Sequence, residues 1–204
     1  MSKEIVDMRK EEIINACEKL YENNSFKDIT IKSIGEETTF SRTSIYNYFQ
    51  TKEEIFLALL KREYERWIDD LNEMYEQNSE MTKEAFADKL ANTVAKRKNL
   101  LKLLSMNMYD MEENSRMEEL IEFKRAYGNA IKMVRKCVDK FFGKMSNEEK
   151  EEFVCLFFPL MYGIYPYAEV TEKQIQAMTS ADVPFKYLSI YDITYKGIIK
   201  LLEE

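Results

Sequence analysis

The chain has 204 residues, a net charge of −7, only 5 Gly and 3 Pro, and no His. So few turn-forming residues argue against an all-β sandwich or barrel, and the lack of His excludes every catalytic or metal site that depends on an imidazole. The acidic balance excludes a protein that coats nucleic acid with its whole surface, so contact with DNA requires a local patch.

The first part of the chain has the spacing of amphipathic helices. Apolar side chains recur every three or four positions over residues 13–21. Thr30 and Ser41 carry hydroxyls of the kind that cap helix N-termini, and Thr51 with Glu54 forms a capping box. The predicted helices cover about residues 7–23, 31–38, 42–49 and 52–78.

The remainder of the chain continues as helices. Capping residues stand at Thr82 and Ser189 and in the boxes Ser115–Glu118, Ser146–Glu149 and Thr171–Gln174. The predicted helices cover about residues 83–98, 99–105, 116–142 and 147–165, a short stretch from 172, and 190–202. No long stretch alternates with period 2, so the expected fold class is all-α.

Cysteines and hydropathy indicate an ordinary intracellular chain. Cys17, Cys137 and Cys155 are far apart and odd in number, which fits idle thiols in a reducing cytosol better than a zinc site or a disulfide scaffold. The N-terminus has no apolar signal core. The uncharged run 154–168 contains Pro159 and is shorter than the roughly 20 residues of a membrane span. We therefore expect a soluble cytoplasmic protein with no membrane partner.

Residues 28–52 read DITIKSIGEETTFSRTSIYNYFQTK, with a tight turn at 38–40 between two short predicted helices. This is helix-turn-helix spacing. Ile45 and Phe49 are expected to face inward, and the opposite face carries one Arg and several small hydrogen-bonding side chains, which suit base edges and phosphates. Residues 38–52 contain no Asp or Glu, although residues 1–56 hold 8 Lys and Arg against 11 Asp and Glu. An ordinary polar surface helix is the alternative interpretation.

Residues 9–60 resemble the N-terminal DNA-binding domain of the TetR family of bacterial transcriptional regulators. The first-helix pattern carries this resemblance together with the string Tyr46-x-x-Phe49-x-x-Lys52-Glu53. Thr39 stands in the turn where the family commonly has Gly. Because a β-branched residue tolerates positive φ poorly, the turn is expected to avoid that conformation or to carry strain.

The resemblance implies a role in DNA binding for individual residues. Thr30, Tyr46 and Lys52 would bind phosphates, and the exposed face of the third helix would read base edges in the major groove. The implied contact residues are Thr30, Lys32, Ser33, Arg42, Thr43, Ser44, Tyr46, Asn47 and Lys52.

Beyond residue 60 the chain is rich in Met, Tyr and Phe. Each of these residues fits either a plain core or the wall of an apolar cavity, for which Met and Tyr are well suited. The resemblance implies a cavity for a small effector, which we expect to be neutral or amphipathic. The candidate lining residues are Trp67, Met106, Tyr109, Phe123, Tyr127, Phe157, Met161 and Tyr165.

The resemblance also implies a homodimer formed by the last two long helices. The candidate interface is the stripe Tyr191, Tyr195, Ile198 and Leu202, beside which Gly197 would permit close helix approach. The expected organisation is a helix-turn-helix domain over residues 1–56, joined by a long helix to a ligand-binding and dimerisation domain over 57–204.

These implications predict a sequence-specific regulator, most simply a repressor, that reads a pseudo-palindromic operator in double-stranded DNA and is released by a small ligand. The alternative is an all-α ligand-binding or scaffold dimer that has lost DNA binding, which the net charge of −3 on residues 1–56 and Thr39 favour. No enzyme, cofactor or metal is expected, because no nucleophile–base set is visible without His.

Overall fold

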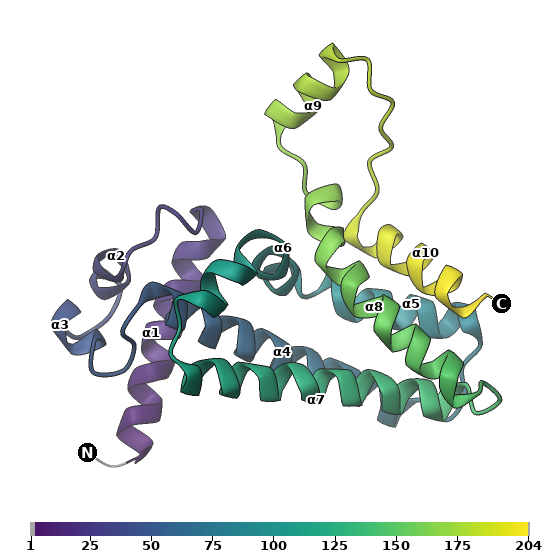
Figure 1. Cartoon of the computed structure of the whole chain (residues 1–204), viewed down its shortest axis with the longest axis horizontal. Coiled ribbons are helices and arrows are strands. Elements are labelled where there is room, and N and C mark those ends of the chain that lie inside the picture. Colours follow the sequence, from purple (N-terminus) through teal and green to yellow (C-terminus); the bar gives the residue numbers. More distant parts are fainter. Residues whose placement is uncertain (1–2, 204) are drawn as a thin grey trace. The chain divides into compact units, whose positions relative to one another are not determined.

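The computed structural model describes residues 3–203, with the backbone alone for Met106 and Asn107. Within these residues the chain is helical and contains no strand, so the predicted all-α class is confirmed (Figure 1). The helices are α1 Lys3–Asn23, α2 Ile31–Glu36, α3 Arg42–Ile45, α4 Lys52–Gln77, α5 Lys83–Ala95, α6 Lys98–Glu113, α7 Met117–Phe141, α8 Asn147–Ala168, α9 Glu172–Ser180 and α10 Ile190–Leu202.

Helix starts agree with the sequence prediction where a side chain caps the helix. Ser146 and Thr171 form two of the four expected capping boxes, and Ser189 also forms one, with Asp192. Ser115 behaves differently, because its hydroxyl donates a hydrogen bond to the Met111 carbonyl at the end of α6, at 2.6 Å. A hydroxyl-bearing residue between two helices can serve either one, and the sequence does not say which.

Two predicted helix ends are wrong. The predicted third helix over 42–49 is shorter, since α3 ends at Ile45 and continues as tight turns in which Asn47 N–H donates to the Ser44 carbonyl at 3.2 Å. The predicted end near residue 105 is also wrong, because α6 continues to Glu113. Ser105 donates its hydroxyl to the Lys102 carbonyl within the helix and does not end it.

The chain forms two compact units, residues 1–64 with 107–127, and residues 65–106 with 128–204. The long helices α4 and α7 each contribute to both units. The predicted boundary after residue 56 falls inside α4, and the first unit includes the end of α6 and the beginning of α7, which that prediction assigned to the second domain.

Each unit has a separate aromatic core. In the first unit Phe56 of α4 meets Tyr21 edge-on, with ring centres 5.2 Å apart. In the second unit Trp67 is fully buried and donates its indole N–H to the Thr93 hydroxyl at 3.0 Å. The buried positions on α1, α2 and α3 therefore fix the short helices onto the first core, while α10 packs on α5 and α8 in the second.

Gly197 allows α10 to approach α8 closely, as the sequence suggested. A Cβ atom at this position would lie 2.5 Å from Cδ2 of Leu160. Among the described residues no single helix is long and apolar enough to cross a membrane, although α8 and α9 together pass that test by length and composition with a bend of 82° between them.

Candidate nucleic-acid interface

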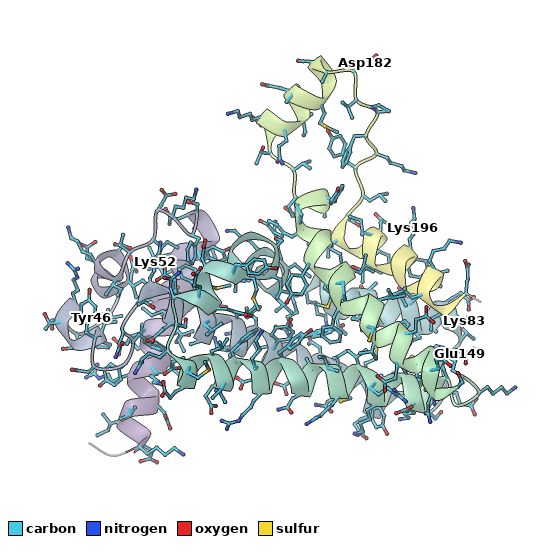
Figure 2. All side chains as sticks on the ribbon, in the orientation of Figure 1. Tyr46, Lys52, Lys83, Glu149, Asp182 and Lys196 are labelled. Atoms are coloured by element: carbon cyan, nitrogen blue, oxygen red, sulfur yellow. The ribbon has the colours of Figure 1, made fainter. Side chains whose placement is uncertain are left out.

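The α2–α3 segment presents a polar face that is supported from behind by buried side chains. Ile34, Ile45 and Phe49 are fully buried, as predicted. Arg42 and Tyr46 lie one turn apart on the exposed side, and a guanidinium nitrogen of Arg42 donates to the Tyr46 hydroxyl at 3.4 Å. Figure 2 shows Tyr46 at the outer edge of α3. The arrangement leaves a planar cation and a phenol in solvent on a fixed backbone.

The other predicted contact residues of this segment also lie at its surface. Thr43 and Asn47 are exposed, and Ser44 is half-buried with its hydroxyl 3.0 Å from that of Ser41. Lys32 is exposed and lies 3.8 Å from Glu36 on the next turn of α2. The structure thus brings Lys32 and the α3 residues onto an accessible surface, and their contact with DNA stays a prediction.

Thr30 and Ser33 complete the N-terminus of α2. Ser33 N–H donates to the Thr30 hydroxyl at 3.1 Å, and Thr30 N–H donates to the Ser33 hydroxyl at 2.9 Å. This reciprocal capping box satisfies backbone donors that would otherwise lack partners. In this structure the two side chains fix the helix that supports the turn; Thr30 remains exposed and Ser33 is half-buried.

The turn at Thr39 is anchored to α1 and is not strained. Thr39 has no positive φ. Its N–H and its hydroxyl both contact the Glu12 carboxylate, each at 2.6 Å. These hydrogen bonds lower the pKa of Glu12 below its usual range. Arg9 donates to the Thr39 hydroxyl at 3.1 Å and stacks its guanidinium over the Phe40 ring. A Thr in place of the usual Gly is therefore held by two hydroxyl hydrogen bonds, to Glu12 and from Arg9, that Gly cannot form.

Lys52 occupies a protein site in this structure. Its ammonium donates to the Phe26 carbonyl at 2.8 Å and to the Ile29 carbonyl at 3.2 Å, and it lies 4.3 Å from the centre of the Phe26 ring. Lys52, which is labelled in Figure 2, is half-buried. The ammonium therefore closes the α1–α2 connection, and the phosphate contact implied by the family resemblance stays a prediction.

The buried carboxylate of Glu54 lies where α4 begins and joins three backbone segments. It accepts from Gln50 N–H at 2.7 Å, and from Arg116 through Nε at 2.6 Å and Nη2 at 2.9 Å. Arg116 Nη2 also donates to the Tyr48 carbonyl at 3.3 Å. Burial alone would raise the pKa of Glu54, but these hydrogen bonds outweigh it and lower the pKa. The chain directly after α3 is thus tied to the α6–α7 turn, which sequence reasoning missed.

Arg9 and Glu12 were also missed, although their i, i+3 spacing on α1 is visible in the sequence. This spacing fits an exposed ion pair as well as a contact that holds the turn at Thr39 to α1, because Thr39 is distant in sequence. Arg116 gave no signal, since its partner lies 62 residues away.

The candidate pocket residues are distributed over both compact units. Phe123 is buried in the first unit, where its ring stacks with that of Tyr127. The Tyr109 side chain is 89% exposed, so in this structure it does not line an enclosed cavity. The side chain of Met106 lies outside the described residues.

In the second unit three of the candidates belong to the packed core. Trp67, Phe157 and Met161 are fully buried, and Tyr165 is half-buried, where burial raises its pKa. A hollow of about 890 Å³ in this unit has other walls, including Met81, Phe142, Met145 and Leu156. This hollow is not lined by the predicted residues, whose role as the wall of a ligand pocket stays a prediction.

The predicted dimer stripe on α10 requires a correction. Ile198 and Leu202 are buried within the protomer, so they contribute to the core of the second unit and are not available to a partner. Tyr191 and Tyr195 are half-buried and stack with ring centres 5.8 Å apart. The Tyr191 hydroxyl donates to Asp88 at 2.6 Å, and this bond raises the pKa of Tyr191 to about 12.

Comparison with known proteins covers both parts of the chain. The family model described as "Bacterial regulatory proteins, tetR family" matches residues 13–59, and that described as "Tetracyclin repressor-like, C-terminal domain" matches residues 61–188. The HTH-type transcriptional regulator YfiR of Bacillus subtilis is 30% identical over 79 residues, which are 39% of this chain and 38% of that protein's length.

Solved structures of low sequence identity share the fold. FadR of Bacillus subtilis, in complex with stearoyl-CoA, has a TM-score of 0.60 at 15% identity, covering 94% of this chain and 96% of its own. FadR of Thermus thermophilus, in complex with lauroyl-CoA, has a TM-score of 0.59 at 16% identity, covering 95% and 93%.

Proposed function

The chain belongs to the TetR family of bacterial transcriptional regulators, and we propose on this basis that it is a homodimeric repressor that binds operator DNA and is released by a small effector. The observation that carries the proposal is the α3 segment, in which Arg42, Thr43, Tyr46 and Asn47 are exposed on one side and Ile45 is fully buried on the other. Such a rigid polar face can enter the major groove, where base edges are distinguishable.

The electrostatics of the first unit support a local contact. Residues 38–52 carry no acidic side chain although the chain as a whole has a net charge of −7. The surface of α1 carries carboxylates, for example those of Glu4, Asp7 and Glu11. An acid-free segment in an otherwise acidic chain favours docking of DNA at the α3 segment.

An apolar or amphipathic effector fits the composition of the second unit. The two FadR proteins were solved with stearoyl-CoA and lauroyl-CoA, and RolR, with a TM-score of 0.59, was solved with resorcinol. These three ligands share an apolar part. We include in the proposal that this chain works in the cytoplasm without catalysing a reaction, since regulators act through differential binding to DNA and effector.

Arg42→Ala tests the DNA contact, with Arg125→Ala as the matched control. Both arginines are exposed in the first unit, but Arg125 lies on α7 and pairs with Glu122 on its own helix. Genomic fragments retained by the wild-type protein supply the operator, and fluorescence anisotropy measures affinity at several salt concentrations.

If Arg42 reads a guanine, Arg42→Ala should weaken the operator by roughly 1–3 kcal/mol per half-site and flatten base preference at one symmetric position. The control should bind like the wild type. Retention of no specific fragment by the wild-type protein would instead support the scaffold alternative.

A further inference from the structure

The hollow of about 890 Å³ in the second unit lies among loops and helix ends. Its walls come from the α4–α5 connection, the end of α7 with the α7–α8 connection, the first turns of α8 and the end of α10. Figure 2 shows Lys83 and Glu149, two of the lining residues, at the same end of the second unit. Small-molecule sites have volumes of about 300–1,000 Å³, so the hollow is large enough to hold a ligand.

One side of the hollow is an aromatic wall that the core supports from behind. The fully buried ring of Phe86 meets three other rings, with centres 5.0, 6.0 and 6.2 Å away, and these belong to Phe142, Phe141 and Phe153. All three line the hollow, and two of them, Phe141 and Phe142, are only half-buried. Met145 in the same lining is also half-buried. Part of this apolar surface is therefore open to the hollow, where it suits a flat or flexible apolar group.

The charged groups of the lining differ in how well they are satisfied. Among them only Lys140 and Glu149 are half-buried, and the others are exposed, where water screens their charges. The Glu149 carboxylate accepts from Ser146 N–H at the start of α8, and this bond lowers the pKa of Glu149. Lys140 has no carboxylate partner among the described residues, and its ammonium donates to the Tyr75 carbonyl at 2.6 Å. Because an ammonium has three N–H donors, Lys140 keeps donors for a further acceptor.

Further cations at the end of α7 increase the positive potential around Lys140. The ammonium groups of Lys136 and Lys140 lie 4.1 and 4.0 Å from the centre of the Tyr75 ring, so two like charges share one aromatic partner. Lys144 follows in the α7–α8 connection and also lines the hollow. Asp139, the acidic residue next to Lys140, pairs with two other cations, at 3.2 and 3.0 Å. The half-buried end of the hollow therefore favours an anion.

We propose that the hollow binds a small amphipathic anion, with an aromatic or short acyl body on the phenylalanine wall and one anionic group at the Lys140 ammonium. The exposed carboxylates of Glu80 and Glu152 also line the hollow, and they disfavour a ligand with several negative charges. A bound ligand joins four separate segments of the second unit, so it should stabilise that unit by mass action. The proposal does not depend on DNA binding or on a homodimer, because binding to the hollow is measured on the protein alone.

Two fluorescent probes separate the apolar body from the charge. Anilinonaphthalene sulfonate has the proposed chemistry, and phenylnaphthylamine is the same ring system without the sulfonate. Lys140→Gln removes the cation, with Lys136→Gln as its control, because both ammonium groups lie over the same tyrosine ring and of the two only Lys140 lines the hollow. Met145→Gln makes the wall polar, with Met178→Gln as its control, because Met178 is half-buried outside the hollow. Circular dichroism checks the fold of each variant, and the exposed Lys144→Gln takes the place of Lys140→Gln if the latter does not fold.

Fluorescence titration gives the dissociation constant of each probe. Lys140→Gln should raise that of the sulfonate probe about five- to tenfold and leave that of the neutral probe within twofold of the wild type. Met145→Gln should raise the dissociation constants of both probes at least about threefold. The two controls should bind both probes like the wild type, and the sulfonate probe should raise the melting temperature of the wild type.

Three results would overturn the proposal. The first is a wild type that binds neither probe with a dissociation constant below about 1 mM. The second is a sulfonate probe that binds Lys140→Gln or Met145→Gln as tightly as the wild type, because the probe would then lie elsewhere on the chain. The third is an equal loss of affinity for both probes in Lys140→Gln, because the lysine would then not act through the charge of the ligand.

Discussion

Arg116→Ala removes the arginine that pairs with the buried carboxylate of Glu54. The substitution removes two side-chain bonds to Glu54, from Nε at 2.6 Å and from Nη2 at 2.9 Å, and the Nη2 bond to the Tyr48 carbonyl. Glu54 is fully buried, whereas the Arg116 side chain is 38% exposed. Hydrogen bonds to charged groups contribute about 1.5–3 kcal/mol each, and breaking a buried pair on one side costs about 3–5 kcal/mol. Because water can reach the space that Arg116 leaves, we expect the lower limit, about 3 kcal/mol.

Urea unfolding followed by circular dichroism measures this loss, with Arg125→Ala, on the helix α7 that follows Arg116, as the control. The control removes an exposed pair and should cost less than about 1 kcal/mol. Glu54→Gln with Arg116→Ala completes a double-mutant cycle, in which the second change should cost little once the first is made. If Arg116→Ala and Arg125→Ala lose the same stability, the Glu54 cluster does not hold the α6–α7 turn to the chain that follows α3.

The pH dependence gives an independent check. The Arg116 and backbone hydrogen bonds lower the pKa of Glu54 from its usual value of 4.5. A carboxyl with a lowered pKa in the folded state contributes stability above the unfolded pKa, and this contribution is lost as pH falls through the folded pKa. The difference between the wild type and Arg116→Ala should therefore be full at pH 7 and decline below about pH 4.5. A difference that stays constant down to pH 3 would refute the electrostatic account.

Three further predictions concern other contacts. Glu12→Gln should destabilise the first unit at pH 7, and this destabilisation should disappear as pH falls below the usual carboxyl range, because hydrogen bonds from Thr39 lower the pKa of Glu12. Urea unfolding at pH 3 to 7 measures the destabilisation, and a destabilisation that is independent of pH would contradict the prediction. Lys52→Met should lower the free energy of unfolding by about 1–3 kcal/mol, since two carbonyl acceptors lose their donor. The control Lys32→Met, on an exposed side chain, should change it by less than about 0.5 kcal/mol. If calorimetry gives equal losses of stability for the two variants, the Lys52 ammonium does not stabilise the fold. Ile198→Ala should lower the free energy of unfolding by about 2–5 kcal/mol in a protein that still dimerises, because Ile198 is fully buried within the protomer. If the variant keeps wild-type stability and light scattering shows a monomer, Ile198 belongs to the dimer interface instead.

Local features of this chain were predictable because the interacting groups are close in sequence. Ser146 and Thr171 cap the helices that their spacing with Glu149 and Gln174 predicts. The buried side of the α3 segment was also predictable, since apolar residues recur there at helical spacing, and Phe49 is fully buried as expected. The family resemblance was also carried by a short continuous stretch, and the family models match on both sides of residue 60.

Contacts between distant segments were not predictable from one sequence. A lysine at the start of a helix is suited both to a phosphate and to backbone carbonyls, and only the tertiary structure places the Lys52 ammonium on Phe26 and Ile29. The wide apolar stripe on α10 fits a partner as well as its own protomer, and the packing of α10 on α5 buries Ile198.

The division of the chain into two compact units also depends on contacts between segments that are distant in sequence. Sequence spacing follows the chain, so it placed the end of the first domain within α4. Hydrogen bonds depend only on distance and direction in space, and Arg116 reaches across 62 residues of sequence to Glu54. The sequence by itself determined that the chain is helical, and it predicted which segment would face DNA. The tertiary structure decided which polar side chains are already engaged, because a side chain with protein partners, such as Lys52, is held by them.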